Sequence, residues 1–268
     1  MDQSLHEFEA LQVRLRESGP AMPKRLRQVA EFVLSHAEDF AFATAAEVAE
    51  AAHVQPSTLV RFAKSIGFSG FSELQALYRT RLRHGFPDYR QRLATLRGAG
   101  GPITMFDGFA RAAEVSLTRA RASLHPGALE NAVTLLARAD TVYLLGARRV
   151  YPMAAALFYA FSKLDVRAVL IDNSGGMAPE QVNSARSGDA LVVVSFSPYA
   201  AVTLETARSA KERSVPVVAI TDSPFSPLAP LADVWLEIAE ADFGAFRSLA
   251  ATHALAMTLA VATAEARA

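Results

Sequence analysis

Five polar or cationic residues lie close together in one stretch of the chain, and their types are those that contact nucleic acid. They are Gln55, Ser57, Thr58, Arg61 and Lys64. An arginine can bind guanine O6 and N7 or a phosphate, a lysine binds phosphate, and glutamine or hydroxyl side chains serve either role. The stretch therefore predicts a DNA-binding surface. An ordinary solvated helix face is the alternative interpretation of the same residues.

A second group of hydroxyl and guanidinium side chains lies in the second half of the chain. Its members are Arg148, Arg149, Ser195, Ser197, Tyr199 and Thr203. Hydroxyls and backbone N–H groups at a helix N-terminus bind phosphate, and arginines grip a carboxylate or phosphate in bidentate fashion. We expect these residues to bind an anionic small molecule. The alternatives are arginines that face solvent or an oligomer contact, and Tyr199 and Thr203 as capping or packing residues.

The sequence offers little for catalysis. It contains no cysteine, its six histidines lie outside the loops that follow predicted strands, and it has no metal-ligand spacing, G-x-S-x-G or Walker sequence. Aldose–ketose isomerisation needs a base near the substrate. The acidic candidates are Glu180, Asp172 and Asp222, and helix capping explains the two aspartates equally well. We expect no catalytic residue, metal or cofactor, with a sugar-phosphate isomerase as the alternative.

The first group is positioned by a predicted helix, turn and helix. Thr44 and Glu47 form a capping box, Pro56 suits the first position of the second helix, and Gly67 stops that helix. In the second helix, one side is apolar: Leu59, Phe62, Ala63 and Ile66. Ser57, Arg61 and Lys64 lie opposite. This is the layout of a helix-turn-helix, whose second helix enters the major groove.

Another helix is predicted over 23–37, with a shorter one over 4–17 before it. The start of the helix predicted over 23–37 carries three cations, Lys24, Arg25 and Arg27. Cations at a helix N-terminus oppose the helix macrodipole. A phosphate contact would explain their position.

The run VQPSTLVRFAKSIGFSGFSEL resembles the N-terminal DNA-binding domain of the RpiR (MurR/RpiR) family of bacterial transcriptional regulators. The residues that match the family pattern are Thr58, Arg61, Phe62, Lys64, Gly67, Phe68, Gly70 and Phe71. Gln55 replaces the usual serine, which costs the helix start about 1 kcal/mol of capping unless Ser57 or water compensates. The resemblance implies that double-stranded operator DNA is a partner.

From Asp140 onward, short β-branched runs alternate with helical segments. The predicted strands are 141–145, 167–171, 190–195, 215–221 and 234–238, and the helices between them are 151–163, 178–185, 200–213 and 226–232. This alternation predicts an α/β domain with a five-stranded parallel sheet flanked by helices. Ligands bind such folds beyond the carboxyl ends of the strands, here the loops 146–152, 173–177, 195–203 and 222–225.

Residues 125–265 are similar to a SIS (sugar isomerase) domain, which usually binds phosphosugars through gly-x-gly-x-ser and ser-x-ser-gly-x-thr turns. Ser195 and Ser197 are kept. The pattern is broken at Arg148, Val150, Pro198 and Ala200. RpiR regulators join this domain to a helix-turn-helix in the order seen here, which implies an effector that is a sugar phosphate or a related metabolite. A SIS domain that has lost its ligand and only forms oligomers is the alternative.

Charge is distributed unevenly along the chain. There are 27 basic and 27 acidic residues, yet the stretch 52–97 carries eight cations against two anions, a net charge of +6. A basic block that contains the predicted recognition helix suits phosphate neutralisation.

The predicted architecture is an all-α helix-turn-helix domain over 1–84, a helical linker over 85–125 and an α/β SIS-like domain over 126–268. The N-terminal residues lack the pattern of a signal peptide, and the apolar stretch 248–264 is too short to span a membrane. We expect a cytoplasmic homodimer or homotetramer that does not bind membranes. Its expected function is transcriptional regulation, as a repressor of a carbohydrate-catabolism operon.

Overall fold

The computed structural model describes residues 11, 14–15, 22–35, 40–41, 43–83, 89–98, 100–224 and 226–268. The chain divides into two compact units, Met1–Gly98 and Ala99–Ala268. Each unit has its own hydrophobic core. We therefore describe the units separately.

The first unit is helical. Its described helices are α2 (Lys24–Ser35), α4 (Ala45–Ala51), α5 (Pro56–Ser65), α6 (Phe71–Arg83) and α7 (Tyr89–Thr95). The ring of Phe40 packs edge-on against Phe71 and Tyr78 in the core, with centroid distances of 5.4 and 4.9 Å. Thr44 and Glu47 form the predicted capping box. Most of the predicted helix over 4–17 lies outside the described residues. Within that range the structure describes Leu11, Arg14 and Leu15, and all three are helical.

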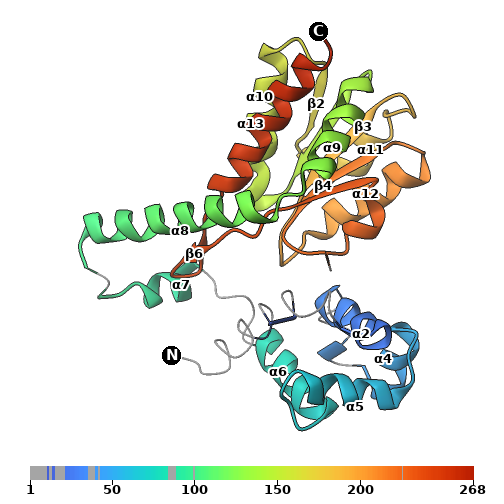
Figure 1. Cartoon of the computed structure of the whole chain (residues 1–268), viewed down its shortest axis with the longest axis vertical. Coiled ribbons are helices and arrows are strands. Elements are labelled where there is room, and N and C mark those ends of the chain that lie inside the picture. The colour runs from blue at the N-terminus through green and yellow to red at the C-terminus, as the bar shows by residue number, and fades with distance from the viewer. Residues whose placement is uncertain are drawn as a thin grey trace. The chain divides into compact units, whose positions relative to one another are not determined.

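The second unit contains the predicted five-stranded parallel sheet (Figure 1). Its strands are β1 (Val142–Gly146), β2 (Ala168–Ile171), β3 (Ala190–Val194), β4 (Val217–Thr221) and β5 (Val234–Glu237), in the spatial order β2-β1-β3-β4-β5. This confirms the predicted fold class. Because the order reverses between β1 and β3, the loops that follow these strands diverge at the carboxyl edge of the sheet, which is where such folds bind ligands.

Helices cover both faces of the sheet. The helices α9 (Pro126–Arg138), α10 (Tyr151–Lys163) and α13 (Ala250–Glu265) pack on one face, and α11 (Ala178–Val182) and α12 (Ala201–Glu212) on the other (Figure 1). Most of the apolar stretch 248–264 forms α13, whose Leu255 and Leu259 lie in the core. Among the described residues, no helix has the length and apolar character needed to cross a bilayer.

The segment 85–125, predicted as a linker, contains α7 and the long helix α8 (Pro102–Ser123). Residues up to Gly98 group with the first unit, whereas α8 belongs to the second and packs against α13. The sequence analysis missed a short hairpin, β6 (Asp242–Phe243) and β7 (Phe246–Arg247), which packs against α8.

Two helices of the first unit, α4 and α6, are preceded by a hydroxyl residue that donates hydrogen bonds to a glutamate in the first turn. Glu47 Oε2 accepts hydrogen bonds from the backbone N and the Oγ1 of Thr44 (2.7 and 2.8 Å), and Glu73 Oε2 accepts from the N and Oγ of Ser69 (2.6 and 2.7 Å). The pKa of Glu47 is lowered below 4.5 chiefly by the backbone hydrogen bond from Thr44. That of Glu73 is lowered chiefly by the Ser69 hydroxyl.

These lowered pKa values predict that acid weakens the first unit. A carboxyl whose pKa is lower in the folded state stabilises the fold above its unfolded pKa, and that contribution is lost as the pH falls through the folded pKa. We expect the melting temperature of this unit to fall as the pH drops below 4.5. The double variant Glu47→Gln, Glu73→Gln should show a shallower fall, followed by circular dichroism, whereas Glu50→Gln in the same region should keep the wild-type slope. An unchanged slope in the double variant would contradict the assignment.

Candidate functional site

In the first unit, the predicted recognition residues lie along α5, from the N-cap Gln55 to Lys64 in the last turn. Gln55 is the N-cap and makes no side-chain capping bond, as expected, and Pro56 occupies the first helical position. Leu59, Phe62, Ala63 and Ile66 are buried, as predicted for the apolar side. Gln55, Ser57, Arg61 and Lys64 are exposed. The helix therefore offers two cations and two uncharged polar side chains to an outside partner.

A shallow cavity of about 340 Å³ lies beside these residues. Its lining includes Arg61, Ser57 and Gln55 of the predicted set, together with Arg25 and His53. The guanidinium of Arg25 donates to the backbone carbonyl of His53 (3.1 Å), which fixes it next to the turn. Arg25 lies outside the group of five predicted binding residues, but its charge near the start of a helix already suggested a phosphate contact in the sequence.

Thr58 occupies a different position from its neighbours. It is only 3% exposed, and its Oγ1 accepts a hydrogen bond from Nη2 of Arg61 (3.4 Å). Thr58 therefore helps to orient Arg61 and lines the same cavity, with almost all of its own surface buried. The periodicity placed Thr58 on the flank of the helix, and packing against the core decided its orientation.

In the second unit, a cavity of about 600 Å³ opens at the carboxyl ends of β1 and β2 and beside the start of α12. Of the six predicted effector-binding residues, only Arg148 lines it. Other lining residues are Tyr151, Asp172 and Asn173. Gly146 ends β1 at this point, and a Cβ there would lie 2.7 Å from the carbonyl oxygen of Val150. The close turn that brings Arg148 to the cavity thus requires glycine.

The cavity combines groups suited to an anion with groups suited to hydroxyls. The start of α12, at Ala200 and Ala201, has no side-chain cap, and its N–H groups and dipole favour negative charge. Arg148 is exposed and adds a guanidinium. Asp172 and Asn173 carry oxygens that can accept hydrogen bonds from a polyol.

Asp172 remains charged at neutral pH. Its carboxylate accepts hydrogen bonds from the Oγ and the backbone N of Ser174 (2.7 and 2.9 Å) and from Gln181 (2.8 Å). These bonds, led by the Ser174 hydroxyl, lower the pKa of Asp172 to about 2. A carboxylate this weakly basic suits hydrogen-bond acceptance better than proton abstraction, which works best with a pKa near the working pH.

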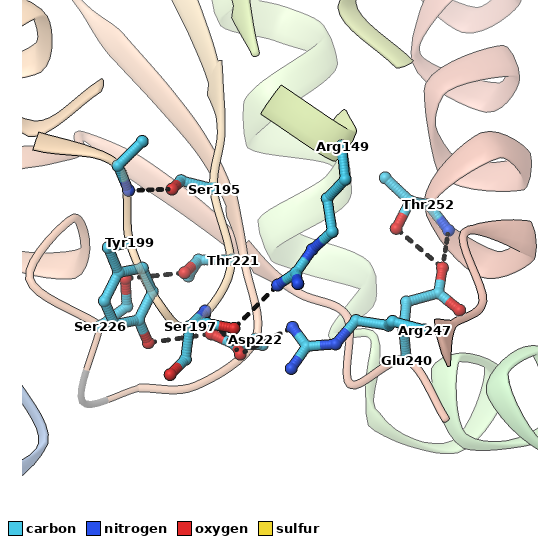
Figure 2. A network of polar contacts seen from close by, with 11 residues as sticks. Arg149, Ser195, Ser197, Tyr199, Thr221, Asp222, Ser226, Glu240, Arg247 and Thr252 are labelled. Carbon is cyan, nitrogen blue, oxygen red and sulfur yellow. Dashed lines mark hydrogen bonds and ion pairs between the residues drawn. The ribbon is translucent and has the colours of Figure 1, made fainter. Parts of the chain in front are cut away.

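Four other residues of the predicted effector-binding set take part in an internal polar network (Figure 2): Arg149, Ser195, Ser197 and Tyr199. Ser195 is buried and its Oγ accepts from the backbone N of Ala200 (3.3 Å), while Nη2 of Arg149 donates to the carbonyl of Ser197 (2.8 Å). Thr203 is fully buried, and its Oγ1 has no hydrogen-bond partner within the described structure. None of these residues lines the cavity, and their assignment to effector binding stays a prediction.

Asp222 is the centre of this network. Its carboxylate is 2% exposed and accepts hydrogen bonds from the backbone N of Ser197 (3.0 Å) and the hydroxyl of Tyr199 (2.8 Å). Nη1 of Arg247 lies 3.4 Å from Oδ2 of Asp222. The loop that follows β3 is therefore bound to the end of β4 and to β7. The sequence predicted Asp222 as a possible base or a helix cap, and no sequence signal linked it to Arg247.

Comparison with known families agrees with both units. Residues 10–85 match the family described as the helix-turn-helix domain of the rpiR family, and residues 135–262 match the SIS domain. The chain is 28% identical over 231 residues to the HTH-type transcriptional regulator HexR of Pseudomonas aeruginosa, an alignment that spans 86% of this chain and 78% of HexR.

Two solved structures are similar to this chain. One is the sugar isomerase domain of an RpiR transcription factor from Sphaerobacter thermophilus, at 28% identity and a TM-score of 0.54, covering 60% of this chain and 87% of that one. The other is the Vibrio vulnificus NanR protein complexed with ManNAc-6P, at 23% identity and a TM-score of 0.55, covering 96% and 90%. The second likeness shows the fold alone.

The cavity geometry predicts that Arg148 dominates anion binding. Arg148→Ala should weaken the binding of inorganic phosphate by about tenfold or more, because hydrogen bonds to charged groups contribute about 1.5–3 kcal/mol. Isothermal titration calorimetry would measure this. Arg167→Ala is the matched control, since Arg167 is exposed and precedes β2 at the opposite edge of the sheet. Equal phosphate affinities for the two variants would contradict the site.

Proposed function

The chain belongs to the RpiR family of helix-turn-helix regulators, and from this premise we propose that it is a transcriptional repressor controlled by a sugar phosphate or a related anionic metabolite. The first unit binds operator DNA through α5. The second unit binds the effector in the cavity beside Arg148. The observation that carries this proposal is that one chain joins an exposed polar, cationic face on α5 to an anion-suited cavity in a SIS domain.

The DNA side of the proposal is supported by the chemistry of α5. Arg61 is hydrogen-bonded to Thr58 and lines the same cavity as Arg25, so two guanidiniums lie at one place beside α5. In a helix-turn-helix, the N-terminal part of the second helix meets the base edges. We assign base readout to Arg61, with Gln55 and Ser57 as its neighbours, and phosphate contacts to Arg25 and Lys64.

The effector side is supported by the pairing of charge and hydroxyl acceptors in one cavity. A phosphate is expected at the start of α12 and against Arg148, and sugar hydroxyls against Asp172 and Asn173. The cavity volume of about 600 Å³ lies within the usual range for small-molecule sites. Control of a carbohydrate-catabolism operon follows from an effector of this class.

Homodimers or homotetramers formed through the second unit complete the proposal. Large apolar side chains are exposed on three of its helices: Ile103 and Phe106 on α8, Tyr159 on α10, and Val261 on α13. Exposed apolar surface of this kind marks interaction sites. A two-fold arrangement presents two recognition helices to the two half-sites of an operator, and a DNA target places the protein in the cytoplasm.

Catalysis by the second unit is disfavoured by the cavity. Its lining within the described structure contains neither histidine nor glutamate, and the pKa of Asp172, at about 2, makes that carboxylate a poor base. We therefore propose that the domain binds its ligand without transforming it.

Replacing Arg61 tests the DNA interface. Arg61→Ala should weaken binding to the specific operator by about 1–3 kcal/mol while leaving the fold intact, because one side chain that reads a base contributes about that much. Fluorescence anisotropy with fragments of the region upstream of the protein's own gene, against random DNA, measures the difference. Arg97→Ala removes the same charge from another exposed position of the first unit. If Arg61→Ala retains wild-type preference for the operator, Arg61 does not read bases.

Sugar phosphates test the effector site. Phosphorylated sugars, such as glucose 6-phosphate or ManNAc-6P, should change operator affinity, typically by about 5–150-fold for an allosteric ligand. Unphosphorylated glucose should have no effect. Arg148→Ala should lose the response but keep operator affinity. A domain that serves only for oligomerisation would give no response to any sugar phosphate in the wild-type protein.

A further inference from the structure

The β6–β7 hairpin contacts two parts of the second unit that are remote in sequence. At one end, Arg247 of β7 pairs with Asp222 (Figure 2). The guanidinium of Arg247 also lies 6.0 Å from the ring centroid of Phe196, the residue between Ser195 and Ser197. Phe196 belongs to the loop that follows β3, and Asp222 accepts hydrogen bonds from Ser197 and Tyr199 of the same loop. The hairpin thus holds this loop by charge and by cation–π contact.

The other end of the hairpin is fixed to α8. The rings of Phe243 and Phe246 pack edge-on against Phe109, with centroid distances of 5.3 and 6.3 Å. The backbone N of Ala241 donates to Oγ of Ser116 (2.9 Å), which is fully buried.

The contact between the hairpin and α8 leaves no free space at Gly108. A Cβ at this position would lie 2.5 Å from the ring of Phe243. Phe243 therefore lies directly on the backbone of α8 at Gly108, so a shift of this ring acts on the helix.

We propose that the β6–β7 hairpin is a relay that couples the loop after β3 to α8, and so conveys the state of the effector cavity toward the DNA-binding unit. The loop ends at Ala200, which lines the cavity, and α8 is the first helix after the DNA-binding unit along the chain. A buried carboxylate cannot lose its partners cheaply. When the loop and Asp222 move, Arg247 moves with them, and Phe243 and Phe246 press on α8. This relay rests on the proposed function, because it joins an effector site to a DNA-binding unit.

Hydrogen–deuterium exchange of the full-length protein, read by mass spectrometry without DNA or effector, tests the relay in both directions. Asp222→Asn should speed exchange by about tenfold in the hairpin (242–247) and in α8 around Phe109, because hydrogen bonds to a charged group are weakened. Gly108→Ala should in turn speed exchange in the loop 195–200. This reciprocity is required of any true coupling.

Two matched variants serve as controls. Asp189→Asn alters another buried carboxylate, which lies before β3 at the amino end of the sheet and accepts a hydrogen bond from the backbone N of Arg186 (2.8 Å). Gly127→Ala adds a methyl group to α9, where the nearest atoms are 3.4 Å away. Neither control variant should speed hydrogen–deuterium exchange in all three segments, which are α8, the hairpin and the loop after β3. If Asp222→Asn fails to fold, Tyr199→Phe removes one of its hydrogen bonds and should give the same pattern with smaller amplitude.

Changes confined to the immediate surroundings of each substitution, or the same pattern in the control variants, would overturn the relay. This measurement needs neither operator nor effector. A failure of the relay is therefore distinct from a failure of the proposed function, which would show as the absence of a sugar-phosphate effect on operator binding.

Discussion

Burial of the Asp222 carboxylate is the constraint on which the organisation of the second unit depends. Removing a carboxylate from water costs several kcal/mol unless charge and hydrogen bonds compensate. Compensation here comes from the Ser197 backbone, the Tyr199 hydroxyl and the Arg247 guanidinium, which lie on two separate segments of the chain. Those segments must therefore converge at the end of β4. One buried charge thereby fixes both the loop after β3 and the hairpin that follows β5.

The two units have different kinds of hydrophobic core, and the kind of core decides where each unit can place polar residues. The first unit buries an apolar helical core, which leaves the opposite side of α5 free for polar and cationic residues. The second unit encloses a parallel sheet between helices, so that its strands are apolar throughout and its polar groups gather at the carboxyl edge. Recognition of DNA uses a helix surface, whereas recognition of a small molecule uses loops on a rigid sheet.

Sequence reasoning recovered those features that depend on local periodicity. The apolar spacing of α5 and the β-branched runs of the five strands define the elements, and the change of period near Asp140 indicates where the sheet begins. The capping box at Thr44 and the stop at Gly67 are local signals that the structure bears out. Arg148 lies two residues after the end of β1, so the strand end fixes its place at the cavity.

The features that escaped prediction depend on distant partners. Ser197 and Tyr199 face Asp222, more than twenty residues away, and no spacing rule reveals that pairing. Strands of two residues, such as β6 and β7, are too short for an alternating pattern to be recognised.

The chemistry of the cavity also depends on contacts between side chains. The carboxylate of Asp172 is held in place by hydrogen bonds from Ser174 and Gln181, so it can accept hydrogen bonds from hydroxyl groups without forming an ion pair with Arg148. A cavity that offers a guanidinium for a phosphate and a carboxylate for hydroxyl groups favours a ligand that carries both a phosphate and a sugar.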